Sequence, residues 1–189
     1  GKPNMELMKA KGYEEQAGRA KELLKKYGDK IMVPRDVAAD VGGQPEVLQV
    51  DETLTGFTVS EVSKFIEHVL ERKSGLPSNF PILDIGPATI EEYSRIIKEA
   101  KTVVANGPMG VFEKKGFERG TFGVLKAMAE SPAFTIIGGG HIVAAAGAAG
   151  VSSRIKHVST GGGATISLLS GEPLPVVEAL QRAARRVKS

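Results

Sequence analysis

The chain has 189 residues, the length of a single domain with a sizeable core, and its 41% hydrophobic and 25% charged content is ordinary for a globular protein. A formal net charge of +3 is too small to indicate nucleic-acid binding, and seven Phe, three Tyr and no Trp leave few rings for base stacking. The absence of cysteine excludes disulfides, thiolate metal sites and a cysteine nucleophile, and it is consistent with a cytoplasmic location. No apolar run approaches about 18 residues, so we expect no membrane span.

The first predicted element is a helix that runs from about Met5, with Asn4 as its cap, and whose pattern is strongest over residues 15–27. Gly28 suits the position that follows its C-terminus. A strand is predicted over residues 31–34, with Arg35 and Asp36 at its carboxyl end. A surface ion pair is a more common explanation of two such charges than a functional role, and we favour it here.

The middle and end of the chain alternate between strand-like and helix-like patterns. The helix predicted over residues 58–75 carries His68, which we interpret as a surface or packing residue because no partner for a catalytic base is visible. The other predicted strands are at 47–50, 102–105, 134–137 and 154–160, and residues 82–87 are a strand or a turn. The other predicted helices are at 90–100, 120–130, 141–146, 164–169 and 174–187. This alternation predicts an α/β fold of the three-layer, Rossmann-like kind, with a mostly parallel sheet between helices.

Three glycine-rich turns each follow a predicted strand, at residues 106–110, 138–140 and 161–163. The carboxyl ends of parallel strands meet at one edge of a sheet, where ligands bind. Glycine lets backbone N–H groups come close to an anion, since it has no Cβ and tolerates positive φ. No turn matches a standard phosphate-binding fingerprint, so any one of them could be a structural turn without a ligand. Three together favour a ligand site.

The residues in these turns resemble a known family. Asn106–Glu113, with the sequence NGPMGVFE, resembles the nucleotide-site segment of phosphoglycerate kinases. Ile137–Gly140 and Ser159–Ala164 match two further motifs of that family in the same order, and Leu83–Pro87 also fits. The match is close from residue 83 to residue 180 and patchy before residue 80.

The resemblance implies an enzyme of glycolysis and gluconeogenesis that transfers a phosphoryl group between 1,3-bisphosphoglycerate and ADP, giving 3-phosphoglycerate and ATP, with Mg²⁺ carried by the nucleotide. Residues 1–189 would form most of its C-terminal, nucleotide-binding lobe, and the complete protein would be a monomer. The family's basic substrate cluster lies in the N-terminal lobe, and a Gly-Gly-Ala-Lys segment lies early in the C-terminal lobe; neither occurs here. Because the chain also begins at Gly1 rather than Met, we expect a fragment that binds adenine nucleotide weakly and is inactive alone.

The resemblance also implies which residues bind the nucleoside. The segment 106–113 would line the adenosine pocket, and Glu113 would accept hydrogen bonds from the ribose hydroxyls. Without the motif, Glu113 would be interpreted as an ordinary surface glutamate. Leu83 and Met109 would form an apolar slot for the purine. The residues predicted to bind this part of the nucleotide are Leu83, Asn106, Pro108, Met109, Val111 and Glu113.

Two further groups of residues would face the phosphates. By resemblance, the predicted phosphate-binding residues are Gly138, Gly139, Gly140, His141 and Ile142. Gly161, Gly162 and Gly163 match the run whose backbone amides face the phosphoryl group in transfer, where they would stabilise the charge on its oxygens. We therefore predict these three glycines as the catalytic residues.

One position departs from the family pattern. His141 stands where the common pattern has an Asp that holds the nucleotide's metal. Because Mg²⁺ prefers oxygen ligands, we predict no metal ligand in this chain. His141 could instead donate a hydrogen bond to a phosphate, or be a helix N-terminal histidine without a function. Histidine at this position favours an archaeal source.

Two other readings of the sequence remain open. A non-catalytic nucleotide-binding or regulatory module could have kept this lobe without the kinase function. An NAD-dependent oxidoreductase domain would have a G-x-G-x-x-G motif near its first strand and an acidic residue about 20 positions later, and that pairing is not found. A preference for ADP over NAD would separate this last alternative from the other two.

Overall fold

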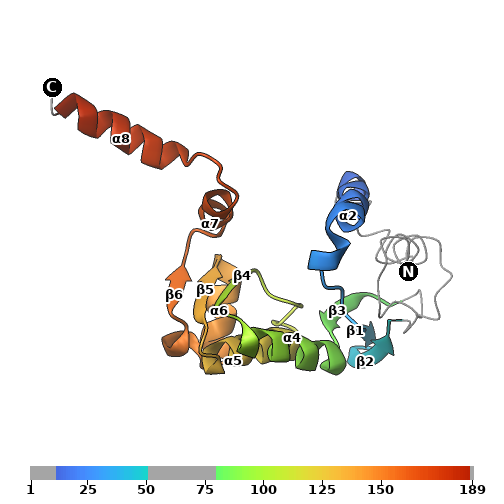
Figure 1. Cartoon of the computed structure of the whole chain (residues 1–189). Coiled ribbons are helices and arrows are strands. Elements are labelled where there is room, and N and C mark those ends of the chain that lie inside the picture. The colour runs from blue at the N-terminus through green and yellow to red at the C-terminus, as the bar shows by residue number, and fades with distance from the viewer. Residues whose placement is uncertain (1–11, 51–79, 188–189) are drawn as a thin grey trace. The chain divides into compact units, whose positions relative to one another are not determined.

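The computed structural model describes residues 12–50 and 80–187 (Figure 1). These residues pack as two units. Within the described ranges, the first contains residues up to 93 together with 109–123, and the second contains 94–108 together with the residues from 124 onward. The predicted helix over 58–75 and its His68 lie outside the described residues. No helix among the described residues combines the length and the apolar character needed to cross a membrane.

The first unit begins with helix α2, Glu14–Tyr27, which confirms the helix predicted over residues 15–27. The predicted start of that helix near Met5 lies outside the described residues. Gly28 does not adopt the left-handed conformation expected of a glycine after a helix. Its φ of −57° and ψ of −29° continue the right-handed path into a 3₁₀ turn, Gly28–Lys30. Helix α2 therefore ends by winding into a tighter 3₁₀ turn, and not in a left-handed glycine that would end the helix.

A three-stranded antiparallel sheet follows in the first unit. Its strands are β1 (Asp36–Val41), β2 (Gln44–Gln49) and β3 (Ile82–Ile85), in the order β2-β1-β3. The β1–β2 hairpin turns at Gly42 and Gly43, whose φ values are 60° and 87°. Positive φ at both residues is typical of the two-residue hairpin turn whose backbone twist matches that of the flanking strands.

One expectation about this region was wrong. The strand predicted over residues 31–34 does not form, and β1 starts after it, because Pro34 has no N–H to donate to a strand ladder. The strand predicted over residues 47–50 forms, but its bounds are Gln44–Gln49. The α/β fold class is confirmed, and the predicted parallel sheet is that of the second unit, whereas this first sheet is antiparallel.

Asp36 also differs from its predicted role. It is fully buried, and its carboxylate accepts hydrogen bonds from the N–H groups of Ala88 and Thr89 at 2.9 and 2.8 Å. It thereby caps helix α4, Pro87–Glu99, which begins directly after β3. Arg35 pairs with Glu92 at 2.8 Å, so the two neighbouring charges do not form the predicted ion pair with each other.

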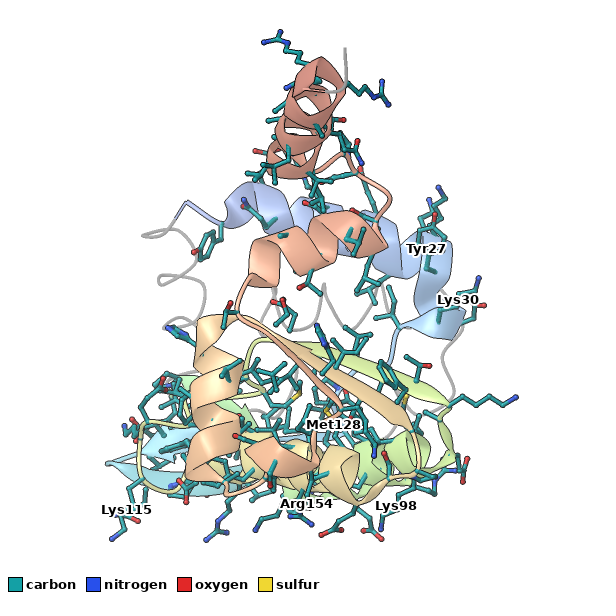
Figure 2. The ribbon with its side chains drawn as sticks, turned by 90° about the vertical axis from the view of Figure 1, so that its left-hand side faces the viewer. Tyr27, Lys30, Lys98, Lys115, Met128 and Arg154 are labelled. Carbon is teal, nitrogen blue, oxygen red and sulfur yellow. The ribbon has the colours of Figure 1, made fainter. Side chains whose placement is uncertain are left out.

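The second unit contains the predicted parallel sheet, in the order β4-β5-β6. Buried side chains of its core include Ala105, Ile137, Ala145, Ala146 and Met128, the last lying among packed side chains in Figure 2. The strands are β4 (Thr102–Asn106), β5 (Phe134–Gly138) and β6 (His157–Ser159). The helices are α5 (Arg119–Glu130, shared between the units), α6 (Gly140–Ala148), α7 (Gly162–Leu169) and α8 (Pro175–Val187). A 3₁₀ turn, Ser152–Arg154, lies between α6 and β6. The strands and helices predicted from residue 82 onward therefore all form, with boundary shifts of a few residues at most.

Candidate functional site

Three glycine turns begin at adjacent strand ends of the second unit. In the parallel register, Asn106 pairs with Gly138, and Gly138 pairs with Ser159. These are the last residues of β4, β5 and β6, so the chain leaves all three strands at the same edge of the sheet. The expectation that parallel pairing would bring these turns together is confirmed.

The turn after β5 opens directly into helix α6. Gly139 has a φ of 104°, which is reached easily only by glycine, and its N–H donates to the Ser159 carbonyl at 3.1 Å. The next N–H groups, of Gly140, His141 and Ile142, lie in the first turn of α6, where a helix provides no acceptor for them. The His141 side chain is exposed, whereas Ile142 is only 2% exposed. Ile142 can therefore offer a ligand its backbone but not its side chain.

The turn after β6 packs backbone to backbone against the turn after β5. A β-carbon built on Gly162 would lie 2.8 Å from the Cα of Gly139 and 3.3 Å from the Nδ2 of Asn106. Asn106 Nδ2 donates to the Gly162 carbonyl at 3.2 Å, which ties the end of β4 to the start of α7. The predicted residues Asn106, Gly138–Ile142 and Gly161–Gly163 are thus brought together within the second unit.

The remaining predicted residues, apart from Pro108 in the second unit, belong to the first unit. Val111 donates its N–H to the Leu83 carbonyl at 2.8 Å, which joins the segment after residue 108 to strand β3. Met109 and Val111 are 36% and 43% exposed, and Glu113 is also exposed. Apolar side chains and one carboxylate are therefore accessible along a short, hydrogen-bonded segment.

Asp84 and Thr121 hold this segment in place, and the sequence did not single out either of them. The Thr121 hydroxyl accepts the N–H groups of Met109 and Gly110 at 3.1 and 3.3 Å. The buried Asp84 carboxylate accepts the Gly120 N–H at 2.7 Å. Asp84 lies in the Leu83–Pro87 motif, where an acidic side chain stands between apolar strand residues. This pattern is the feature of the sequence that could have identified Asp84 as a functional residue.

Burial raises the pKa of Asp84 above its ordinary value. The hydrogen bonds from the Gly120 and Ile85 N–H groups oppose this shift, and the charge of Glu118 adds to it. Its Oδ1 lies 2.4 Å from where a β-carbon on Gly110 would be, and 2.2 Å from one on Gly120. Only glycine fits at these two positions around the carboxylate.

The described residues contain no group of three or more His, Cys, Asp or Glu side chains that could hold a metal ion. The turn after β5 and the start of α6 instead offer backbone N–H groups and the imidazole of His141. These donors suit an anion better than a hard cation.

Comparison with known proteins identifies the family. The family model described as "Phosphoglycerate kinase" matches residues 3–172. The chain belongs to the phosphoglycerate kinase family. The chain is 46% identical over 180 residues to the phosphoglycerate kinase of Methanopyrus kandleri, an alignment that covers 95% of this chain and 39% of that protein. It is 42% identical over 188 residues to that of Methanococcus maripaludis, with 98% and 40% covered. The relatives of this name are mostly archaeal, as histidine at position 141 suggested.

Solved phosphoglycerate kinases have the same fold. The crystal structure of the Pyrococcus horikoshii enzyme matches with a TM-score of 0.75 at 40% identity, covering 94% of this chain and 39% of that one. The structure of the Coxiella burnetii enzyme matches with a TM-score of 0.67 at 29% identity, covering 90% and 42%. The chain therefore spans about two fifths of the length of these phosphoglycerate kinases.

Proposed function

We propose that this chain is the nucleotide-binding part of a phosphoglycerate kinase and that it binds ADP and ATP. The observation that carries the proposal is the meeting of three strand-end turns in the second unit, where Gly139 and Gly162 pack backbone to backbone. In open parallel sheets this edge is where ligands bind. Residues 1–189 would form most of the C-terminal lobe, and 3-phosphoglycerate would be bound by other parts of the complete enzyme.

The phosphates would lie against the first turn of α6. Its free N–H groups and its helix dipole favour an anion there. The backbone amides of Gly161–Gly163, at the start of α7, would face the phosphoryl group during transfer. Fixed amides stabilise charge that spreads over the oxygens of a phosphoryl group in flight, without having to reorient during the reaction.

The nucleoside would contact the segment that carries Met109, Val111 and Glu113. The exposed apolar side chains of Met109 and Val111, with Leu83 beside them, suit a purine face. The exposed Glu113 carboxylate would accept hydrogen bonds from the ribose hydroxyls. Asn106 and Pro108, at the end of β4 and just after it, are the other residues that we propose for nucleotide binding.

Mg²⁺ would enter this site bound to the nucleotide. When bound, it neutralises phosphate charge during transfer. The chain's own part would be to hold the phosphates through backbone amides and His141. Because transfer also needs the other substrate held in line, we expect this chain alone to bind nucleotide without measurable turnover.

Calorimetric titration with ADP in the presence of Mg²⁺ tests the proposal. We compare the wild type with Glu113→Ala and with the control Glu130→Ala, which removes another exposed glutamate at the end of α5. Loss of the ribose hydrogen bonds should raise the Kd of Glu113→Ala by about tenfold or more, while Glu130→Ala should bind like the wild type. A wild-type chain that does not bind ADP, or that prefers NAD, would contradict the proposal.

A further inference from the structure

We propose that Thr121 is a positioning residue for the nucleoside side of this site: its hydroxyl holds the backbone of Met109 and Gly110 so that the Met109 and Val111 side chains are presented to the nucleoside. The inference rests on the proposed function, because it assigns a role toward the same nucleotide. All the residues that carry it belong to the first unit.

Thr121 reaches the segment from helix α5. It is 1% exposed and lies in the first turn of that helix. Its hydroxyl oxygen accepts two hydrogen bonds, from the Met109 N–H at 3.1 Å and from the Gly110 N–H at 3.3 Å. A hydroxyl has two acceptor lone pairs, so both are used on this one turn.

The start of α5 is itself held by Asp84. The Asp84 carboxylate accepts the N–H of Gly120, the residue before Thr121, at 2.7 Å. The same carboxylate lies against Gly110, where a β-carbon would be only 2.4 Å from Oδ1. Asp84 therefore contacts both the turn and the helix end that carries Thr121, and it fixes the distance between them.

These contacts occupy the backbone N–H groups of residues 109–111 and leave their side chains for a ligand. The N–H groups of Met109 and Gly110 are bonded to Thr121, and the N–H of Val111 is bonded to the Leu83 carbonyl. The Met109 and Val111 side chains remain 36% and 43% exposed. A segment held in this way before the nucleotide arrives does not need to be ordered on binding, which saves binding free energy.

Removal of the hydroxyl would leave two N–H groups without their acceptor. A buried donor without a partner is unfavourable, so the turn would move to find other acceptors. Met109 and Val111 would then lose their fixed orientation, while the rest of the chain kept its fold.

The test uses the 189-residue chain and three variants. Thr121→Val removes the hydroxyl at nearly constant shape, and Thr121→Ser keeps the hydroxyl. The matched control is Thr135→Val. Thr135 is also 1% exposed and also accepts a backbone N–H, that of Lys156 at 3.2 Å, but it lies near the amino end of β5. The measurements are the ADP Kd by calorimetry, the melting temperature, and the exchange rates of the Met109 and Gly110 amides by NMR.

We expect Thr121→Val to raise the Kd for ADP by about tenfold, and Thr121→Ser and Thr135→Val to stay within about twofold of the wild type. The Met109 and Gly110 amides should exchange faster in Thr121→Val alone. A purely structural role would lower the melting temperature of both valine variants without this difference in Kd. If Thr121→Val does not fold, Thr121→Ala removes the same hydroxyl.

Two results would overturn the inference while leaving the proposed function intact: ADP binding by Thr121→Val that is as tight as that of the wild type, or an equal loss in Thr121→Ser and Thr121→Val. Unchanged exchange of the Met109 and Gly110 amides in Thr121→Val would show that the hydroxyl does not hold the turn. A wild-type chain that binds no ADP overturns the proposed function and this inference together.

Discussion

Gly139 and Gly162 meet without room for a side chain between them. A β-carbon on Gly162 would lie 2.8 Å from the Gly139 Cα and 3.1 Å from its N atom. Both neighbours are backbone atoms, which cannot rotate away as a side chain could. The starts of α6 and α7 are therefore held at a spacing that only glycine at position 162 permits.

Alanine at position 162 should push these two turns apart. We expect Gly162→Ala to lower the free energy of unfolding by about 1–3 kcal/mol, the usual cost of forcing extra volume into a packed contact. Gly163→Ala is the control, because nothing lies within 4 Å of its added β-carbon and the residue is helical. That control should be neutral or up to about 1 kcal/mol more stable. Denaturant unfolding measures both, and equal stability of the two variants would contradict the prediction.

Asp36 should be more important for stability than other acidic residues. It accepts the N–H groups of Ala88 and Thr89, and the Thr89 hydroxyl donates to it at 2.7 Å. We expect Asp36→Ala to cost about 3 kcal/mol, since it removes a helix cap and leaves buried donors unpaired. Asp36→Asn keeps one carbonyl acceptor and should lose less. The control Asp29→Ala, at an exposed position, should change the unfolding free energy little in the same denaturant titration.

The ion pair between Lys114 and Asp40 predicts a pH dependence of stability. The hydrogen bond from Lys114 lowers the pKa of Asp40 below its ordinary value of 3.8. A carboxyl group with a lowered pKa contributes stability above its unfolded-state pKa, and that contribution disappears as the pH falls through the lower, folded-state pKa. The stability difference between wild type and Lys114→Met should therefore be complete near pH 6 and shrink below about pH 4.

The control for this pair is Lys115→Met, which removes an exposed neighbouring charge (Figure 2). It should show no such change with pH. Lys114 also lies over the Phe117 ring, 5.3 Å from its centroid, so part of the loss in Lys114→Met will be independent of pH. A difference that stays constant between pH 6 and pH 3 would rule out the Asp40 contribution.

His141→Asp tests the position that departs from the family pattern. A carboxylate in the first turn of α6 should stabilise the ligand-free chain by about 0.5 kcal/mol through the helix dipole. If position 141 lies beside the nucleotide's metal, the Kd for ADP should also fall roughly fivefold or more on adding Mg²⁺, compared with a smaller change in the wild type. His157→Asp, at the start of β6, is the control. Equal Mg²⁺ dependence in all three proteins would place position 141 away from the metal.

The sequence alone was sufficient for the second unit. Its strands are short apolar runs, such as residues 134–137, and each ends at a glycine turn that leads into a helix. Those signals are local, and parallel pairing follows from the alternation of strands and helices. The meeting of the turns at Asn106, Gly138 and Ser159 followed from that topology.

Only the tertiary structure decided the organisation of the first unit. The antiparallel pairing of β1 with β3 joins Val37 to Ile85, and the Asp36 cap reaches Thr89, 53 residues away. Thr121 acts 11 and 12 residues back along the chain, on Gly110 and Met109. Polar residues of these types usually lie on the surface, and nothing in their local sequence states which backbone groups they will meet. The chain's own residues set its helices, strands and glycine turns, whereas contacts between distant segments determined which carboxylates and hydroxyls are buried and what they hold.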